Sequence, residues 1–164
     1  MTDKVTVKKA SIDKLRTMGS KLHIVKNTCH LELEIYDHLT KNTVRYKATF
    51  LTGYCCDGLS VPKIFQWFLK SWDDDNDLYN AAGMLHDWLY STKGVDGMFT
   101  RSECDDIFRG ILRESGKDRK HASIADWAVG LFAGGKEHWN NDTYNCKHLC
   151  LFTLESQRDD LKEE

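Results

Sequence analysis

The stretch Asn80 to Tyr90, which reads NAAGMLHDWLY, predicts the helix around which the rest of the chain is organised. Its apolar residues recur at helical spacing, and its small residues allow another backbone to approach closely. His86 and Tyr90 lie four positions apart and share one face, whereas Asp87 is rotated by about 100° and points to other neighbours. Ionisable side chains within an apolar helix are costly unless each has a partner. The rest of the chain is therefore expected to supply those partners.

The composition is typical of a soluble globular protein, with 41% hydrophobic residues, 29% charged residues and a net charge of −2. A chain of 164 residues is long enough for one domain with its own core. The small net charge makes nucleic acid an unfavoured partner, and no apolar run reaches the roughly 20 residues that span a bilayer. Residues 1–10 lack the apolar stretch of a secretory signal. We therefore expect a cytosolic protein whose six cysteines are reduced.

The N-terminal half carries the alternation that is typical of strands. A short strand is expected at Lys4 to Lys8, followed by a helix or turn around Ser11 to Met18. His30 to Asp37 alternates apolar and polar residues, and Thr43 to Thr52 is rich in β-branched and aromatic residues. These two segments predict a hairpin.

The second half is typical of helices joined by glycine-bearing loops. Thr100 and Glu103 form a capping-box pattern that opens one of them, and Gly116 ends it. The expected helices are Pro62 to Leu69, Asp77 to Ser91, Arg101 to Glu114 and Lys120 to Ala133, with a loop at Thr92 to Phe99. The predicted fold is therefore α+β: an N-terminal β-hairpin or small antiparallel sheet packed on three to four helices. We treat residues 1–164 as a single domain, with an arm or edge strand at 1–26, a core at 27–138 and a tail at 139–164.

Asp105 is the expected partner of His86. It lies nineteen positions further on and borders the apolar face of the next helix, whereas Asp106 points away from that face. A carboxylate that accepts the proton of one imidazole nitrogen leaves the other nitrogen basic. His86 could then activate a water as a general base, with Tyr90 hydrogen-bonded to the supporting aspartate.

The neighbouring Asp87 is the expected ligand of a divalent cation. Oxygen ligands suit calcium or magnesium, and a cation here would stabilise an oxyanion during hydrolysis. The loop Gly53 to Gly58 contains Asp57 and is the expected source of further ligands. The spacing alone leaves a second interpretation open, and slightly favours it: a His-Asp pair on adjacent helices that only satisfies itself and fixes packing.

The pattern His86-Asp87-x-x-Tyr90, followed by Asp105, resembles the site of the secreted phospholipase A2 family. It is more similar to the compact version in parvovirus capsid proteins, whose Ala-Asp-x-x-Phe corresponds here to Cys104-Asp105-Asp106-Ile107-Phe108. The resemblance implies that His86 is the general base, that Asp87 binds calcium, and that Asp105 and Tyr90 are its support. It leaves open whether Asp105 or Asp106 takes the supporting place.

A longer stretch, Asp57 to Trp139, resembles a family of uncharacterised small proteins found mainly in phages and prophages. The shared features are Asp57-Gly58-x-Ser60-x-Pro62, Ala81-Ala82-x-x-x-His86-Asp87-Trp88-Leu89-Tyr90, and Arg101-Ser102 followed by Asp105 or Asp106. This resemblance implies a phage product in the host cytoplasm or associated with the virion.

Three functions follow as hypotheses. The first is a calcium-dependent hydrolase of a lipid or another small ester. The second is a non-catalytic phage protein that binds a host protein or a small ligand, for example as an inhibitor of host defence, with exposed contact residues at Trp67, Trp72 and Trp139. The third is a component of virion assembly.

Two other groups of residues are weaker candidates for a site. Cys146-x-His148-x-Cys150 carries atoms that can bind zinc, but its spacing favours a plain tail. Cys104 or Cys56 as the nucleophile of a cysteine hydrolase has no supporting motif.

Overall fold

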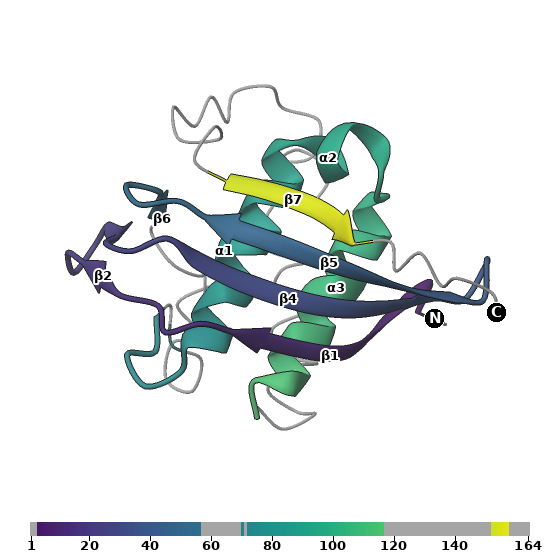
Figure 1. The fold of residues 1–164 in the computed structure, drawn as a ribbon, viewed down its shortest axis with the longest axis horizontal. Helices are drawn as coiled ribbons and strands as arrows, with labels where there is room; N and C mark the ends of the chain where they lie inside the picture. The colour runs from purple at the N-terminus through teal and green to yellow at the C-terminus, as the bar shows by residue number, and fades with distance from the viewer. Residues whose placement is uncertain (1–2, 57–69, 71, 117–151, 158–164) are drawn as a thin grey trace, which may run out of the picture.

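The structure is a computed structural model, and it describes residues 3–56, 70, 72–116 and 152–157. Within these residues the fold is α+β, as predicted, with strands first and helices after them (Figure 1). The strands are β1 (Val5–Ile12), β2 (Thr17–Met18), β3 (His23–Val25), β4 (Cys29–Asp37), β5 (Asn42–Phe50), β6 (Cys55–Cys56) and β7 (Phe152–Gln157). The helices are α1 (Asp77–Ser91), α2 (Lys93–Gly97) and α3 (Arg101–Glu114).

Two antiparallel sheets form the strand layer. The larger sheet has the order β1-β4-β5-β7, and the smaller has the order β2-β3-β6. The predicted hairpin is confirmed as β4 and β5, which pair from Cys29 with Phe50 to Asp37 with Asn42. Strand β7 lies at one edge of the larger sheet, so a segment that the sequence predicted to be a tail pairs with β5.

The first strand is longer than expected because it contains a bulge. The register of β1 against β4 shifts between Val7 and Lys9, and pairing then continues to Ile12. One inserted residue returns Ala10 and Ile12 to the core side of the sheet. The helix that was one alternative around Ser11 to Met18 is wrong, since this segment contains the end of β1 and the short strand β2.

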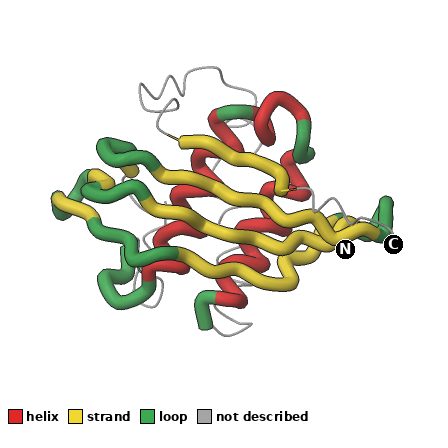
Figure 2. Tube along the Cα trace, in the orientation of Figure 1, coloured by secondary structure: helices red, strands yellow, loops and turns green. Residues whose placement is uncertain are grey.

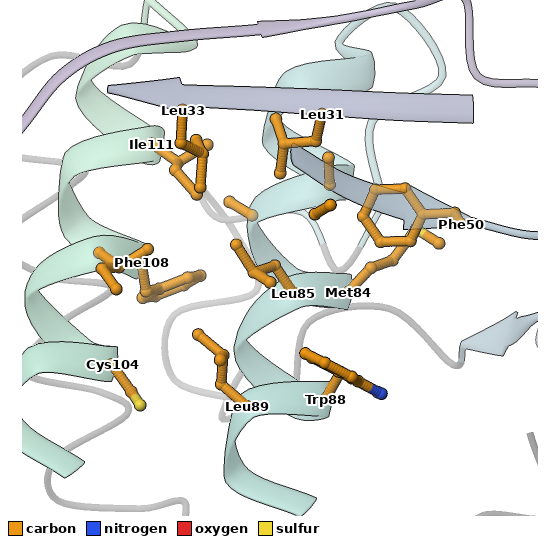
Figure 3. Packing of buried hydrophobic residues seen from close by; sticks show 14 of the residues in the cluster. Leu31, Leu33, Phe50, Met84, Leu85, Trp88, Leu89, Cys104, Phe108 and Ile111 are labelled. Carbon is orange, nitrogen blue, oxygen red and sulfur yellow. The ribbon is translucent and has the colours of Figure 1, made fainter. Parts of the chain in front are cut away.

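Helices α1 and α3 lie side by side on one face of the larger sheet (Figures 1 and 2). Side chains of β4 and β5 meet those of both helices in a shared core, which Figure 3 shows for ten labelled residues. Gly110 of α3 lies so close to β1 that a Cβ atom there would stand 2.6 Å from the Cβ of Val7. This close approach explains a glycine in the middle of a helix.

Local hydrogen bonds cap the starts of the two long helices. The side chain of Asn76 accepts a hydrogen bond from the amide of Tyr79 and caps α1. The predicted capping box between Thr100 and Glu103 is present at the start of α3. These hydrogen bonds fix where each helix begins, and the packing of α1 against α3 then brings His86 and Asp105 together.

The connection between these helices is not the open loop that was expected. Lys93 to Gly97 all have positive φ angles, and they form a short left-handed turn. Gly94 accepts this conformation without cost, whereas Val95, at φ 55°, is strained.

Two predicted helices, Pro62 to Leu69 and Lys120 to Ala133, lie outside the described residues. Among the helices that are described, none has the length and apolar character that crossing a membrane requires.

Candidate functional site

The structure brings His86 and Asp105 together across the interface between α1 and α3. The imidazole Nε2 lies 3.0 Å from Oδ1 of Asp105. A carboxylate can only accept a hydrogen bond, so Nε2 carries the proton and donates it. The neutral imidazole then has its lone pair on Nδ1. Nδ1 makes no hydrogen bond to any residue in the described part of the chain.

Tyr90 completes this group from the next turn of α1. Its hydroxyl donates to the same Oδ1 of Asp105 at 2.6 Å. The pKa of Tyr90 is raised, first because the phenol is buried and then because it lies against the Asp105 carboxylate. The phenol therefore stays protonated at neutral pH and remains a donor. Asp105 thus accepts from two side chains of α1, which holds its carboxylate in one orientation.

The imidazole is enclosed by rings. His86 and Tyr90 are 7% and 8% exposed, and their ring centroids are 4.3 Å apart. Phe108 of α3 packs on the imidazole with a centroid distance of 4.7 Å. The side chain of Asp105 is 20% exposed, so the group reaches solvent mainly through this carboxylate. Such packing restricts the ring to one orientation, which a general base requires.

Asp106 does not take the supporting place. Its carboxylate points to β1, where Oδ2 accepts hydrogen bonds from the amides of Lys4 and Val5 at 2.8 and 3.3 Å. Its Oδ1 lies 2.6 Å from Nη2 of Arg109. Of the two aspartates that the sequence left open as the partner of His86, Asp105 contacts the imidazole and Asp106 contacts the start of β1.

The pKa of Asp106 is raised despite these partners. Burial of the carboxyl group is the main cause, and the two amides and the Arg109 charge oppose it. Arg109 also bonds Asp3 at 2.9 Å, while its Nε is buried without a hydrogen-bond partner. The Asp106 carboxylate therefore joins α3 to the start of β1. We call its contacts with Lys4, Val5 and Arg109 the clasp of Asp106.

The predicted cation ligands are only partly described. Asp87 lies on α1 next to His86 and is half-buried, whereas Asp57 is outside the described residues. Nowhere in the described part do three His, Cys, Asp or Glu side chains gather into a metal-binding group. Calcium takes about six to eight oxygen ligands. The described residues thus provide one expected ligand and do not by themselves fit a calcium ion.

The remaining candidates from the sequence are cysteines and tryptophans. Cys104 is fully buried, and burial raises the pKa of its thiol, so it is not a reactive thiolate. Cys56 is buried in β6. Trp72 was expected to be an exposed contact residue, which is wrong: it is half-buried and stacks on His23 with a centroid distance of 3.8 Å. Trp67, Trp139 and the Cys146 to Cys150 motif lie outside the described residues.

Two features were not found from the sequence. The clasp of Asp106 on β1 joins residues about a hundred positions apart, which no local pattern predicts. Only the ion pair of Asp106 with Arg109, three positions on, could have been predicted from spacing. The stack of His23 on Trp72 gave no signal, because it depends on how β3 packs against the segment before α1.

The comparisons with known proteins give one match. The model of a family described as a protein of unknown function, DUF1353, matches residues 34–129. The matched region begins in β4 and includes His86, Asp87, Tyr90 and Asp105. No curated protein and no solved structure matches the chain.

Proposed function

The chain belongs to this family of proteins of unknown function, DUF1353, and we propose that it is a phage-encoded hydrolase of a lipid or another ester. The observation that supports the proposal is the hydrogen bond between Nε2 of His86 and Asp105. It leaves Nδ1 as the basic nitrogen of the imidazole. The host cytoplasm or the virion is its proposed location.

In the proposed reaction, His86 acts as the base in the hydrolysis of an ester. Nδ1 of His86 takes a proton from water, and the water oxygen attacks the ester carbonyl. The imidazolium that forms is stabilised by the Asp105 carboxylate on its other side. His86 then returns the proton to the departing alkoxide, so that one water and one ester become an acid and an alcohol. Tyr90 keeps Asp105 in place throughout.

Calcium remains a proposed cofactor, with Asp87 and Asp57 as its expected ligands. The described residues supply Asp87 alone, so the steps above use only His86, Asp105 and Tyr90. Whether the cation is needed is a question for titration.

The test is hydrolysis of phospholipid vesicles and of a soluble short-chain ester, each with calcium and with a chelator. Wild type should hydrolyse at least one of them, and His86→Gln should be inactive while its circular dichroism is unchanged. Calorimetry should show that calcium binds wild type and not Asp87→Asn. If wild type hydrolyses neither substrate in either condition, the proposal is wrong.

A non-catalytic role is the second candidate, and the burial of the group favours it. His86 and Tyr90 are each more than nine-tenths buried, and both satisfy the same carboxylate oxygen. In that case the group fixes α1 against α3, and the protein binds a host protein or a small ligand elsewhere. This role predicts that His86→Gln lowers the free energy of unfolding and that no ester is hydrolysed.

A further inference from the structure

Arg101 differs from the other arginines in the described part of the chain. Arg45 bonds Glu34, Arg109 bonds Asp3 and Asp106, and Arg113 lies 3.8 Å from Asp3. Arg16 is exposed. Arg101 is half-buried, yet it makes no ion pair or hydrogen bond through its guanidinium to a described residue. A half-buried cation without a carboxylate partner is costly, because water solvates it only in part.

Its position links it to the His86 group. Arg101 is the first residue of α3 and lies four positions before Asp105, so the two share one face of the helix. The positive charge of Arg101 also reaches Tyr90. Burial is the main reason that the pKa of this phenol is raised, and the Arg101 charge acts in the opposite direction. The Arg101 charge therefore acts on the hydroxyl that holds Asp105.

The two carboxylates closest to Arg101 along α3 each use one oxygen for another partner, and neither forms an ion pair with Arg101. Oδ1 of Asp105 accepts from His86 and Tyr90. The carboxylate of Glu103 accepts from the amide and the hydroxyl of Thr100 in the capping box. The same box occupies the helix end, so an anion here would be bound by the Arg101 side chain. An arginine whose neighbouring carboxylates serve other partners is free to bind a carboxylate or phosphate from outside the protein.

We infer that Arg101 binds an anionic group of the substrate, a phosphate or a carboxylate, on the face of α3 that carries Asp105. The inference rests on the hydrolase proposed above, and it narrows the substrate to esters that carry a negative charge near the reacting carbonyl. Arg101 determines specificity and takes no part in proton transfer.

A binding experiment tests the site without relying on activity. Inorganic phosphate and acetate are titrated separately into wild type, Arg101→Gln and Arg16→Gln at matched ionic strength. Binding is followed by NMR signals of the arginine side chains and the His86 ring. One of the anions should give saturable shifts at Arg101 and His86 in wild type and in Arg16→Gln. The anion that binds identifies the group. The inference fails if neither anion gives saturable shifts, or if Arg101→Gln retains them.

A kinetic experiment compares an anionic ester with a neutral ester of the same chain length. For the anionic ester, Arg101→Gln should raise KM about tenfold to a hundredfold, as expected for loss of a charge-assisted hydrogen bond. The neutral ester should be hydrolysed at an unchanged rate, and Arg16→Gln should match wild type on both. Equal effects on the two esters would overturn the inference while leaving the hydrolase intact. Anion binding at Arg101 in a protein that hydrolyses no ester would remove the hydrolase and keep the site.

Discussion

Asp105 and Asp106 are adjacent in α3, and their carboxylates serve opposite interfaces. The side chain of Asp105 is 20% exposed and accepts from His86 and Tyr90 of α1. The side chain of Asp106 is 3% exposed and accepts from the amides of Lys4 and Val5, at the start of β1, and from Arg109. Successive residues of a helix differ by about 100° in direction, which is enough to place two identical side chains in different surroundings.

The two aspartates differ in the groups that donate hydrogen bonds to them. Every partner of Asp106 is a donor of the backbone or a charged side chain, so removing this carboxylate leaves buried groups unsatisfied. Asp105 instead bonds one nitrogen of an imidazole whose other nitrogen makes no hydrogen bond to a described residue. The first arrangement stabilises the fold, and the second can move a proton. Substitutions at Asp105 and Asp106 should therefore affect catalysis and stability differently.

The largest effect is expected on catalysis. Asp105→Asn should lower kcat for the hydrolysed ester by about 10²- to 10⁴-fold, because the amide no longer fixes or stabilises the His86 imidazole. Asp106→Asn should keep most of the wild-type kcat in the same assay. Circular dichroism of both variants checks that they are folded. Similar losses of kcat in both would show that Asp105 has no special role.

The next effect is expected on stability. Asp106→Ala should lower the free energy of unfolding by about 3 kcal/mol, since two amides and Nη2 of Arg109 lose the acceptor that Asp106 provides. Asp105→Ala should cost about 1–2 kcal/mol, because it leaves two buried donors of His86 and Tyr90 unsatisfied, but these donors are neutral and the Asp105 side chain is partly accessible. Urea denaturation measures both values. A larger loss for Asp105→Ala would reverse the assignment of roles.

A third effect concerns the contact of α3 with β1 without any charge. Gly110→Ala should lower the free energy of unfolding by about 1–3 kcal/mol, because the new methyl group would overlap Val7. Glu114→Ala, at an exposed position of the same helix, should change it by less than about 0.5 kcal/mol. If Gly110→Ala is as stable as wild type in urea, the two elements are less tightly packed than described.

The smallest effect is a pH dependence, and its sign follows from the raised pKa of Asp106. A folded-state pKa above the ordinary value of 3.8 means that the folded protein binds the proton more tightly. As the pH falls through that folded value towards 3.8, wild type should therefore gain stability relative to Asp106→Asn.

Asp37 provides the opposite case for the same measurement. Hydrogen bonds, first from the amide of Leu39, lower its pKa. Wild type should lose stability relative to Asp37→Asn as the pH falls below 3.8. Urea denaturation at several pH values measures both differences. A loss of stability relative to Asp106→Asn at acid pH would mean that Arg109 outweighs burial at Asp106.

Local patterns were enough to predict much of this arrangement. Helix α1 has the bounds that its apolar periodicity predicted, and the capping box set the start of α3. The periodicity of α3 placed Asp105 beside the apolar face and gave the contact with His86, but its prediction that Asp106 points away was wrong, because Asp106 is buried against the start of β1. The β4–β5 hairpin followed from alternation.

The rest depended on distant contacts. The bulge in β1 and the clasp of Asp106 require the helix and the first strand to be placed together, and no sequence pattern joins residues a hundred positions apart. Pairing of β7 with β5 likewise joins distant segments. The half-buried state of Trp72 follows from its stack on His23, which the composition of its own segment could not indicate.

The most direct test of the central claim is the protonation pattern of the His86 ring, read from its nitrogen chemical shifts in ¹⁵N-labelled protein at a pH where the ring is neutral. Wild type should carry the proton on Nε2 and leave Nδ1 unprotonated. This preference should be lost in Asp105→Asn and retained in Asp106→Asn. A proton on Nδ1 in wild type, or an unchanged pattern in Asp105→Asn, would contradict the assignment of His86 as a base supported by Asp105.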